Sequence, residues 1–141
     1  MGEDTEFVSR FRSEERPIVY VPGTAVTHCL AEKQVELMSL FERAFFFGRT
    51  HITLSPEAPV IRKNPLESRL LKAEEERQFM RGIMINFYCG ELNQLCKANL
   101  LPDRRLLDAL RGLEIQLARG LLSPVCLQFL SSEPELCRLI G

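Results

Sequence analysis

The sequence contains no apolar run of the ~18–20 residues that are needed to cross a bilayer. Its densest apolar stretch, residues 44–47 (Ala-Phe-Phe-Phe), is followed at once by Gly48. The first residues, Met1 to Asp4, are acidic and lack the apolar segment of a secretory signal peptide. We therefore expect an intracellular protein, cytoplasmic or nuclear, with no membrane span.

The sequence also has no excess of charge of one sign. Its 141 residues include 18 Lys and Arg against 19 Asp and Glu, for a formal net charge of -1. This balance argues against a dedicated nucleic-acid binder and against a polybasic membrane anchor. The length fits one domain, since domains cluster near ~100–150 residues. We expect a flexible or docked N-terminal arm over 1–16 and a single domain over 17–141.

The usual signatures of catalysis and of metal or cofactor binding are absent from the sequence. It contains no glycine-rich phosphate loop, HExxH, CxxC or GxSxG motif. The five cysteines are an odd number without closely spaced pairs, which disfavours both a disulfide framework and a structural zinc site. We expect no cofactor, no metal and no small-molecule substrate, with the cysteines reduced.

Most of the sequence has the apolar spacing that is typical of helices, with one exception near the N-terminus. The segment 17–21 is β-branched, lies between a proline and a Pro-Gly turn, and could pair with 51–54 as a small two-stranded element. Between these segments, an apolar stripe predicts a helix that begins after a threonine cap and runs to about Phe47. Gly48 provides its stop signal.

The clearest local signal is the helix start at Asn64-Pro65, with Glu67 placed to complete a capping box. Apolar residues then recur at helical spacing to about Ala98. A straight helix of that length would be ~50 Å long, whereas a domain of this size has a radius of gyration of ~14 Å. We therefore predict a kink or break at Gly82 or Gly90, since glycine is unfavourable inside a helix.

Three shorter helices are predicted after this point. One begins at Pro102-Asp103, with Leu106, Leu110, Leu113 and Leu117 on its apolar side and a stop at Gly120. Others begin at Ser123-Pro124 and at residues 132–135. A succession of helices joined by short loops predicts a mainly α fold, an antiparallel bundle or helical-hairpin array of four to six helices.

Two groups of basic residues define one possible function. Arg62, Lys63 and Arg69 belong to the 62–72 group, and Arg104 and Arg105 belong to the 104–111 group. They could contact phosphate or an acidic partner, so a nucleic-acid-associated factor is an alternative. Interleaved acidic residues and the absence of a neighbouring aromatic residue for base stacking disfavour it.

The histidines and Cys29 define a further alternative, a small enzyme with a nonstandard site. His28 adjoins Cys29, but neighbours on a helix point about 100° apart, so the two side chains would not face each other. His51 could reach Cys29 only through the fold. The simpler interpretation is a buried Cys29 and a half-exposed His28 at the start of the helix.

The apolar surplus of the two longest predicted helices favours a different function. Residues 45–47 are consecutive phenylalanines, and a helix normally buries one stripe, so at least one ring is expected to face outward unless another segment covers it. We predict a non-enzymatic protein–protein interaction module, an adaptor or complex subunit, whose partner is another protein or a second copy of the chain. The expected anchors are Phe46, Phe47, Met84 and Tyr88, because Phe, Met and Tyr suit such surfaces.

Overall fold

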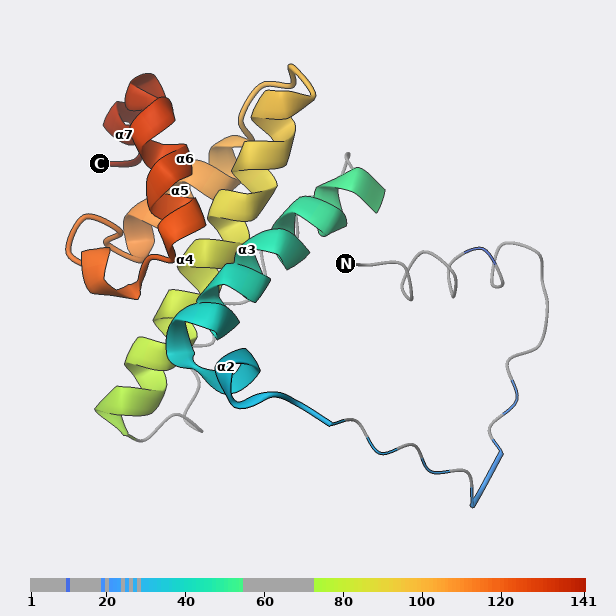
Figure 1. The fold of residues 1–141 in the computed structure, drawn as a ribbon. Helices are drawn as coiled ribbons and strands as arrows, with labels where there is room; N and C mark the ends of the chain where they lie inside the picture. Colours follow the sequence, from blue (N-terminus) through green and yellow to red (C-terminus); the bar gives the residue numbers. More distant parts are fainter. Residues whose placement is uncertain are drawn as a thin grey trace.

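The structure, a computed structural model, describes residues 10, 19, 21–23, 25, 27, 29–54 and 73–141. Within these residues the chain is mainly α-helical and contains no strand (Figure 1). The predicted arm over 1–16, apart from Arg10, and the predicted cap at Asn64 lie outside the described residues.

Six α-helices and one short 3-10 helix make up the described part of the chain. In order they are α2 (Glu32–Val35), α3 (Leu37–Leu54), α4 (Glu74–Lys97), α5 (Arg104–Gly112), η2 (Arg119–Leu121), α6 (Pro124–Ser132) and α7 (Pro134–Ile140).

The starts of the C-terminal helices follow local capping chemistry and confirm the predictions. The Asp103 carboxylate accepts a hydrogen bond from the backbone N–H of Arg105 at the start of α5. The Ser123 hydroxyl accepts one from the backbone N–H of Cys126 at the start of α6. Each bond satisfies a donor that the first helical turn leaves unpaired. Pro124 and Pro134 occupy first-turn positions, where proline's missing N–H carries no penalty.

The predicted end of the first long helix at Gly48 is wrong. Helix α3 continues through Gly48 to Leu54, so residues 51–54 are helical and do not form the expected strand. The partner segment of that strand, 17–21, lies mostly outside the described residues. Gly48 is buried against α4, and this tertiary contact overrides its weak helix propensity.

The predicted break does not fall at Gly82 or Gly90, since α4 is one helix from Glu74 to Lys97. The chain departs from a helical path earlier, because Ala73, just before α4, has an extended backbone. Both glycines face α3. A β-carbon at Gly82 would overlap the ring of Phe41, and one at Gly90 would overlap the backbone carbonyl of Phe45. These glycines let the two helices approach closely, a role for which only a hydrogen side chain fits.

Helices α3 and α4 run in the same direction, which corrects the expectation of an antiparallel arrangement for this pair. The Phe41 ring stacks on Phe79 near the start of both helices, with centroids 6.1 Å apart. Further along, the Arg49 side chain reaches Gln94. Residues 55–73 join the two helices and could span ~60 Å when extended, whereas the 18 residues of α3 are ~27 Å long. The connection is therefore long enough to return to the starting end.

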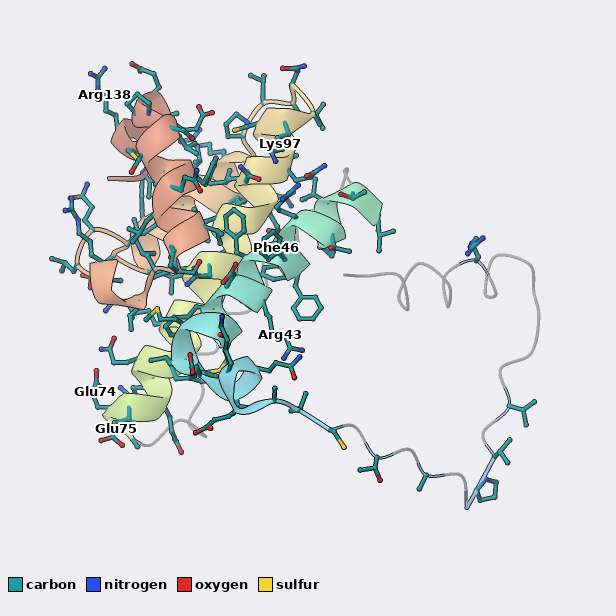
Figure 2. All side chains as sticks on the ribbon, viewed as in Figure 1. Arg43, Phe46, Glu74, Glu75, Lys97 and Arg138 are labelled. Carbon is teal, nitrogen blue, oxygen red and sulfur yellow. The ribbon has the colours of Figure 1, made fainter. Side chains whose placement is uncertain are left out.

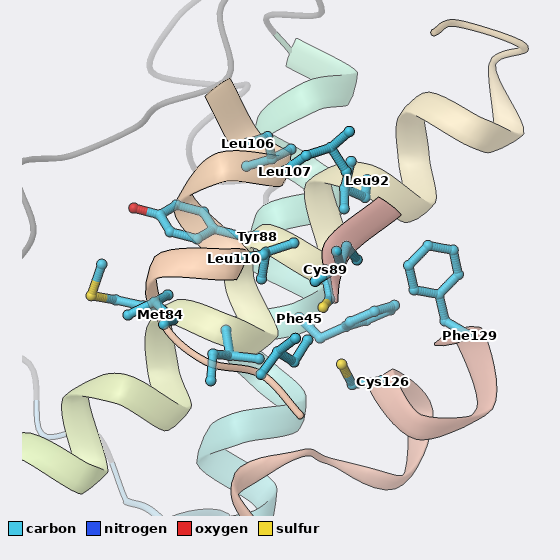
Figure 3. Close-up of a cluster of buried hydrophobic side chains, with 14 of the residues drawn as sticks. Phe45, Met84, Tyr88, Cys89, Leu92, Leu106, Leu107, Leu110, Cys126 and Phe129 are labelled. Atoms are coloured by element: carbon cyan, nitrogen blue, oxygen red, sulfur yellow. The ribbon is translucent and has the colours of Figure 1, made fainter. Parts of the chain in front are cut away.

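The core lies where α4 meets α3 on one side and the C-terminal elements on the other (Figure 3). Phe45 of α3 packs near Phe129 of α6, with ring centroids 6.2 Å apart. Leucines of α5 complete the core, as their spacing predicted, with one exception. Helix α5 ends at Gly112, and Leu117 beyond it is 80% exposed, so Leu117 does not belong to the predicted stripe.

Candidate functional site: the outward face of helix α3

The three consecutive phenylalanines of α3 occupy three different environments. Phe45 is 3% exposed and belongs to the core. Phe46 is partly buried and packs against the core with its ring perpendicular to that of Phe45. Phe47 is 46% exposed. The expectation that at least one of these rings faces outward is confirmed by Phe47.

Phe47 belongs to a surface that we call the outward face of α3. It comprises Arg43, Phe46, Phe47, Thr50 and Leu54, which recur three or four residues apart and so share one side of the helix. The opposite side carries the buried residues of α3 (Phe41, Ala44, Phe45, Gly48 and Ile52). Leu54 is 39% exposed. From residue 43 to residue 54 the face is ~17 Å long.

Cationic side chains accompany the aromatic rings of this face. The Arg49 guanidinium lies 5.8 Å from the centroid of the Phe46 ring, within the range of a cation–π interaction. Its Nε also donates a weak hydrogen bond, 3.5 Å long, to the side-chain oxygen of Gln94. Figure 2 shows Arg43 and Phe46 together on α3. The only acid of α3 is Glu42, so the helix carries two arginines against one carboxylate.

Neither Arg43 nor Arg49 forms an ion pair within the part of the chain that the structure describes. Several arginines on the other helices differ in this respect. Arg81 pairs with Glu114, Arg105 with Asp103 and Arg111 with Asp108. The cations beside the outward face of α3 are therefore available to a carboxylate from elsewhere.

The two anchors predicted on α4 lie inside the protein. Met84 is 9% exposed and Tyr88 is 3% exposed, and both belong to the core cluster. Helix α4 is surrounded by α3, α5 and α6, so its nearly continuous apolar surface is that of a central helix. Their burial is incompatible with an anchor role, and the candidate site keeps only Phe46 and Phe47 of the predicted set.

Of the predicted basic residues, the structure describes only Arg104 and Arg105. Arg62, Lys63 and Arg69 lie outside the described residues. Arg104 and Arg105 are exposed at the start of α5. The side chain of Arg105 forms a two-point contact with the Asp103 carboxylate, and this hydrogen bonding lowers the pKa of Asp103. Arg105 is thus engaged in its own helix cap.

Of the residues of the predicted Cys/His site, the structure describes Cys29 and His51 and places them in different surroundings. His28 lies outside the described residues. Cys29 is exposed in the segment before α2, so the expectation that it is buried at the start of a helix is wrong. His51 instead faces α4, where its Nδ1 lies 2.9 Å from Oε1 of the fully buried Glu91. Glu91 is not among the residues predicted from the sequence. Its helical spacing from Tyr88 and Leu95 places it on the buried side of α4, and that spacing was the available signal.

Three of the described cysteines have raised pKa values. Cys89 and Cys126 are buried side by side in the core (Figure 3). A hydrogen bond with the Cys126 thiol, together with burial, raises the pKa of Cys89 well above its usual range. Burial also raises the pKa of Cys96 and of Cys137. A raised pKa disfavours the thiolate, which is the reactive form.

A cluster of hydrogen bonds joins α4 to the segment between α5 and α6. The Asn86 side-chain amide is fully buried and donates hydrogen bonds to the carbonyls of Gly82 and Leu121, at 2.8 and 2.7 Å. Its carbonyl oxygen accepts a bond from the Ser123 N–H at 2.9 Å. Nearby, Arg81 Nε donates to the Leu113 carbonyl at 2.7 Å. These bonds fasten the segment between α5 and α6 onto α4.

A hollow of about 340 Å³ near the end of α7 is lined by Arg111, Glu114, Ile115, Gln116, Ile140 and Gly141, which include neither a histidine nor a cysteine. Among the described residues, no three His, Cys, Asp or Glu side chains are grouped as metal ligands. No helix in the described ranges has the length and apolarity to span a membrane.

Comparison with known proteins adds no further constraint. No protein-family model matches the chain, and no curated protein or solved structure matches it.

Proposed function

We propose that the chain is a non-enzymatic protein–protein interaction module, an adaptor or complex subunit, that binds a partner through the outward face of α3. The observation that carries this proposal is the 46% exposure of Phe47 on a helix whose opposite side forms the core. Partly buried Phe46 lies beside it and extends the apolar surface toward the core.

The physical argument rests on what burial of these groups contributes on association. Covering an exposed Phe side chain contributes about 1.5–3 kcal/mol by area arithmetic. A contribution of that size is typical of an interface hot spot, and aromatic residues are enriched among hot spots. Phe47 is preorganised for this role because its helix is anchored by Phe41, Phe45 and Ile52, each of which is at most 3% exposed.

The alternative functions receive less support from the described residues. For a nucleic-acid-associated factor, Arg104, Arg105 and Arg111 would have to release carboxylates that already lie beside them. For an enzyme, His51 would have to serve a nucleophile, whereas its Nδ1 lies against the buried side chain of Glu91. We therefore retain the interaction module as the proposed function.

Site-specific photocrosslinking tests the proposal. The photoreactive amino acid p-benzoylphenylalanine would replace Phe47 in one variant and Leu117 in another, within cells that express the chain. Both side chains are exposed, and Leu117 lies outside the outward face of α3. A discrete crosslinked partner from residue 47 and none from residue 117 would support the proposal. The same adducts from both positions, or none from residue 47, would contradict it.

A further inference from the structure

The cations beside the outward face of α3 indicate what kind of partner it fits. Arg43 lies between Phe46 and Phe47 in the helical order of the face, and Arg49 borders it. Within the described residues neither arginine has a carboxylate partner, whereas Arg81, Arg105 and Arg111 have one each. An interface that covers Phe47 would bring opposing groups close to these guanidinium groups.

We propose that the occupant of this face is an acidic amphipathic helix of another protein, with an apolar stripe against Phe47 and Leu54 and carboxylates opposite Arg43 and Arg49. This inference rests on the proposed function and adds the chemistry of the partner. A helix fits because the face is itself one side of a helix about three turns long, on which a second helix packs ridge into groove. Carboxylates fit because guanidinium groups pair with them in two-point geometry.

The geometry favours an acidic partner over a neutral or basic one for an electrostatic reason. Like charges placed opposite each other across an interface are strongly unfavourable, and complementary charges raise the rate of association. Glu42 alone offsets the two arginines on α3. A basic helix would therefore meet two unpaired cations, and a neutral helix would leave them desolvated without a partner.

Two synthetic peptides that differ only in flanking charge test this inference. Both would be labelled amphipathic helices with the same Leu and Phe stripe, one flanked by Glu and the other by Lys. Their binding to the full chain would be measured by fluorescence anisotropy. The Glu-flanked peptide should bind at least about tenfold more tightly than the Lys-flanked one. The double variant Arg43→Glu/Arg49→Glu should reverse that preference, while Arg119→Glu, on the exposed η2, should leave it unchanged.

Each of the other possible results would contradict the proposal of an acidic helical partner, and each would point to a different explanation. Equal binding of both peptides, weakened equally by Phe47→Ala, would remove the charge preference and leave the proposed function standing. Tighter binding of a labelled single-stranded oligonucleotide, lost in Arg43→Glu/Arg49→Glu, would identify nucleic acid as the occupant. Sedimentation of the unliganded chain as a dimer that Phe47→Ala dissociates would identify a second copy. If neither peptide bound, the proposal of an acidic helical partner would be wrong. The crosslinking experiment at residue 47 would still test the proposed interaction function independently.

Discussion

Gly48 of α3 lies so close to Phe87 of α4 that a β-carbon at residue 48 would overlap the Phe87 carbonyl oxygen. Gly90 of α4 makes the reciprocal contact with the Phe45 carbonyl of α3. The two helices therefore touch backbone to backbone at their crossing. This crossing fixes the rotation of α3 about its axis, because it determines which side faces α4 and thus places Phe47 on the other side.

Replacing Gly48 with alanine should destabilise the protein through this crossing. The added methyl group has no free volume, and overpacking of this kind costs about 1–3 kcal/mol. The free energy of unfolding, measured by urea denaturation, would show the loss. Gly112→Ala is the matched control, since a β-carbon at residue 112 meets nothing within 4 Å. Gly112→Ala should leave stability unchanged or raise it by up to about 1 kcal/mol. Equal effects at both positions would refute the close crossing.

The buried amide of Asn86 gives a second prediction. Asn86→Ala removes the partner of the Ser123 N–H and of the Leu121 carbonyl, and leaving buried polar groups unsatisfied costs about 1–3 kcal/mol for each group. We expect a lower free energy of unfolding and faster hydrogen exchange at the Ser123 amide. Asn93→Ala, at a half-buried position of the same helix, is the control and should have little effect. If Asn86→Ala matched that control, the fastening role of Asn86 would be wrong.

The cap of α5 predicts a specific pH dependence. Hydrogen bonding from Arg105 lowers the pKa of Asp103 in the folded state. A carboxyl group with a lowered folded pKa stabilises the protein above its unfolded pKa of about 3.9, and that stabilisation is lost as the pH falls through the folded pKa. Asp103→Asn retains a capping side chain and removes the charge.

The difference in unfolding free energy between the wild type and Asp103→Asn should therefore be constant near neutral pH and shrink below about pH 4. It should stay under about 1 kcal/mol, since the Arg105 side chain is largely exposed and water screens the pair. A difference that grew on acidification would contradict the assigned direction of the Asp103 shift.

Much of the helical structure could be predicted from the sequence, because short-range chemistry determines it. The starts at Asp103, Ser123 and Pro134 depend on groups within one turn of each other. The predictions that helices end or break at Gly48 and Gly90 are wrong because long-range contacts determine the structure there. Each glycine meets a carbonyl from a helix about 40 residues away in the sequence, and local propensity contains no information on that contact.

The candidate site was predictable only in part. Helical geometry requires that three consecutive phenylalanines cannot all be buried in one stripe, and Phe47 is the one that remains exposed. The same reasoning failed for Met84 and Tyr88, since the sequence does not show that α4 has neighbours on several sides. The unpaired state of Arg43 depends on which carboxylates the fold brings near it, so the sequence could not reveal it.

The affinity of the Phe47→Ala chain for the partner crosslinked at residue 47 is the measurement that tests the central claim most directly. Loss of a hot spot of about 2 kcal/mol predicts binding about 30-fold weaker. Leu117→Ala, which removes an exposed leucine elsewhere, should bind as the wild type does. The unfolding free energy of Phe47→Ala should fall by less than about 1 kcal/mol. Unchanged affinity for Phe47→Ala, or a stability loss near the ~3–5 kcal/mol of a truncated core Phe, would contradict the claim that the outward face of α3 binds the partner.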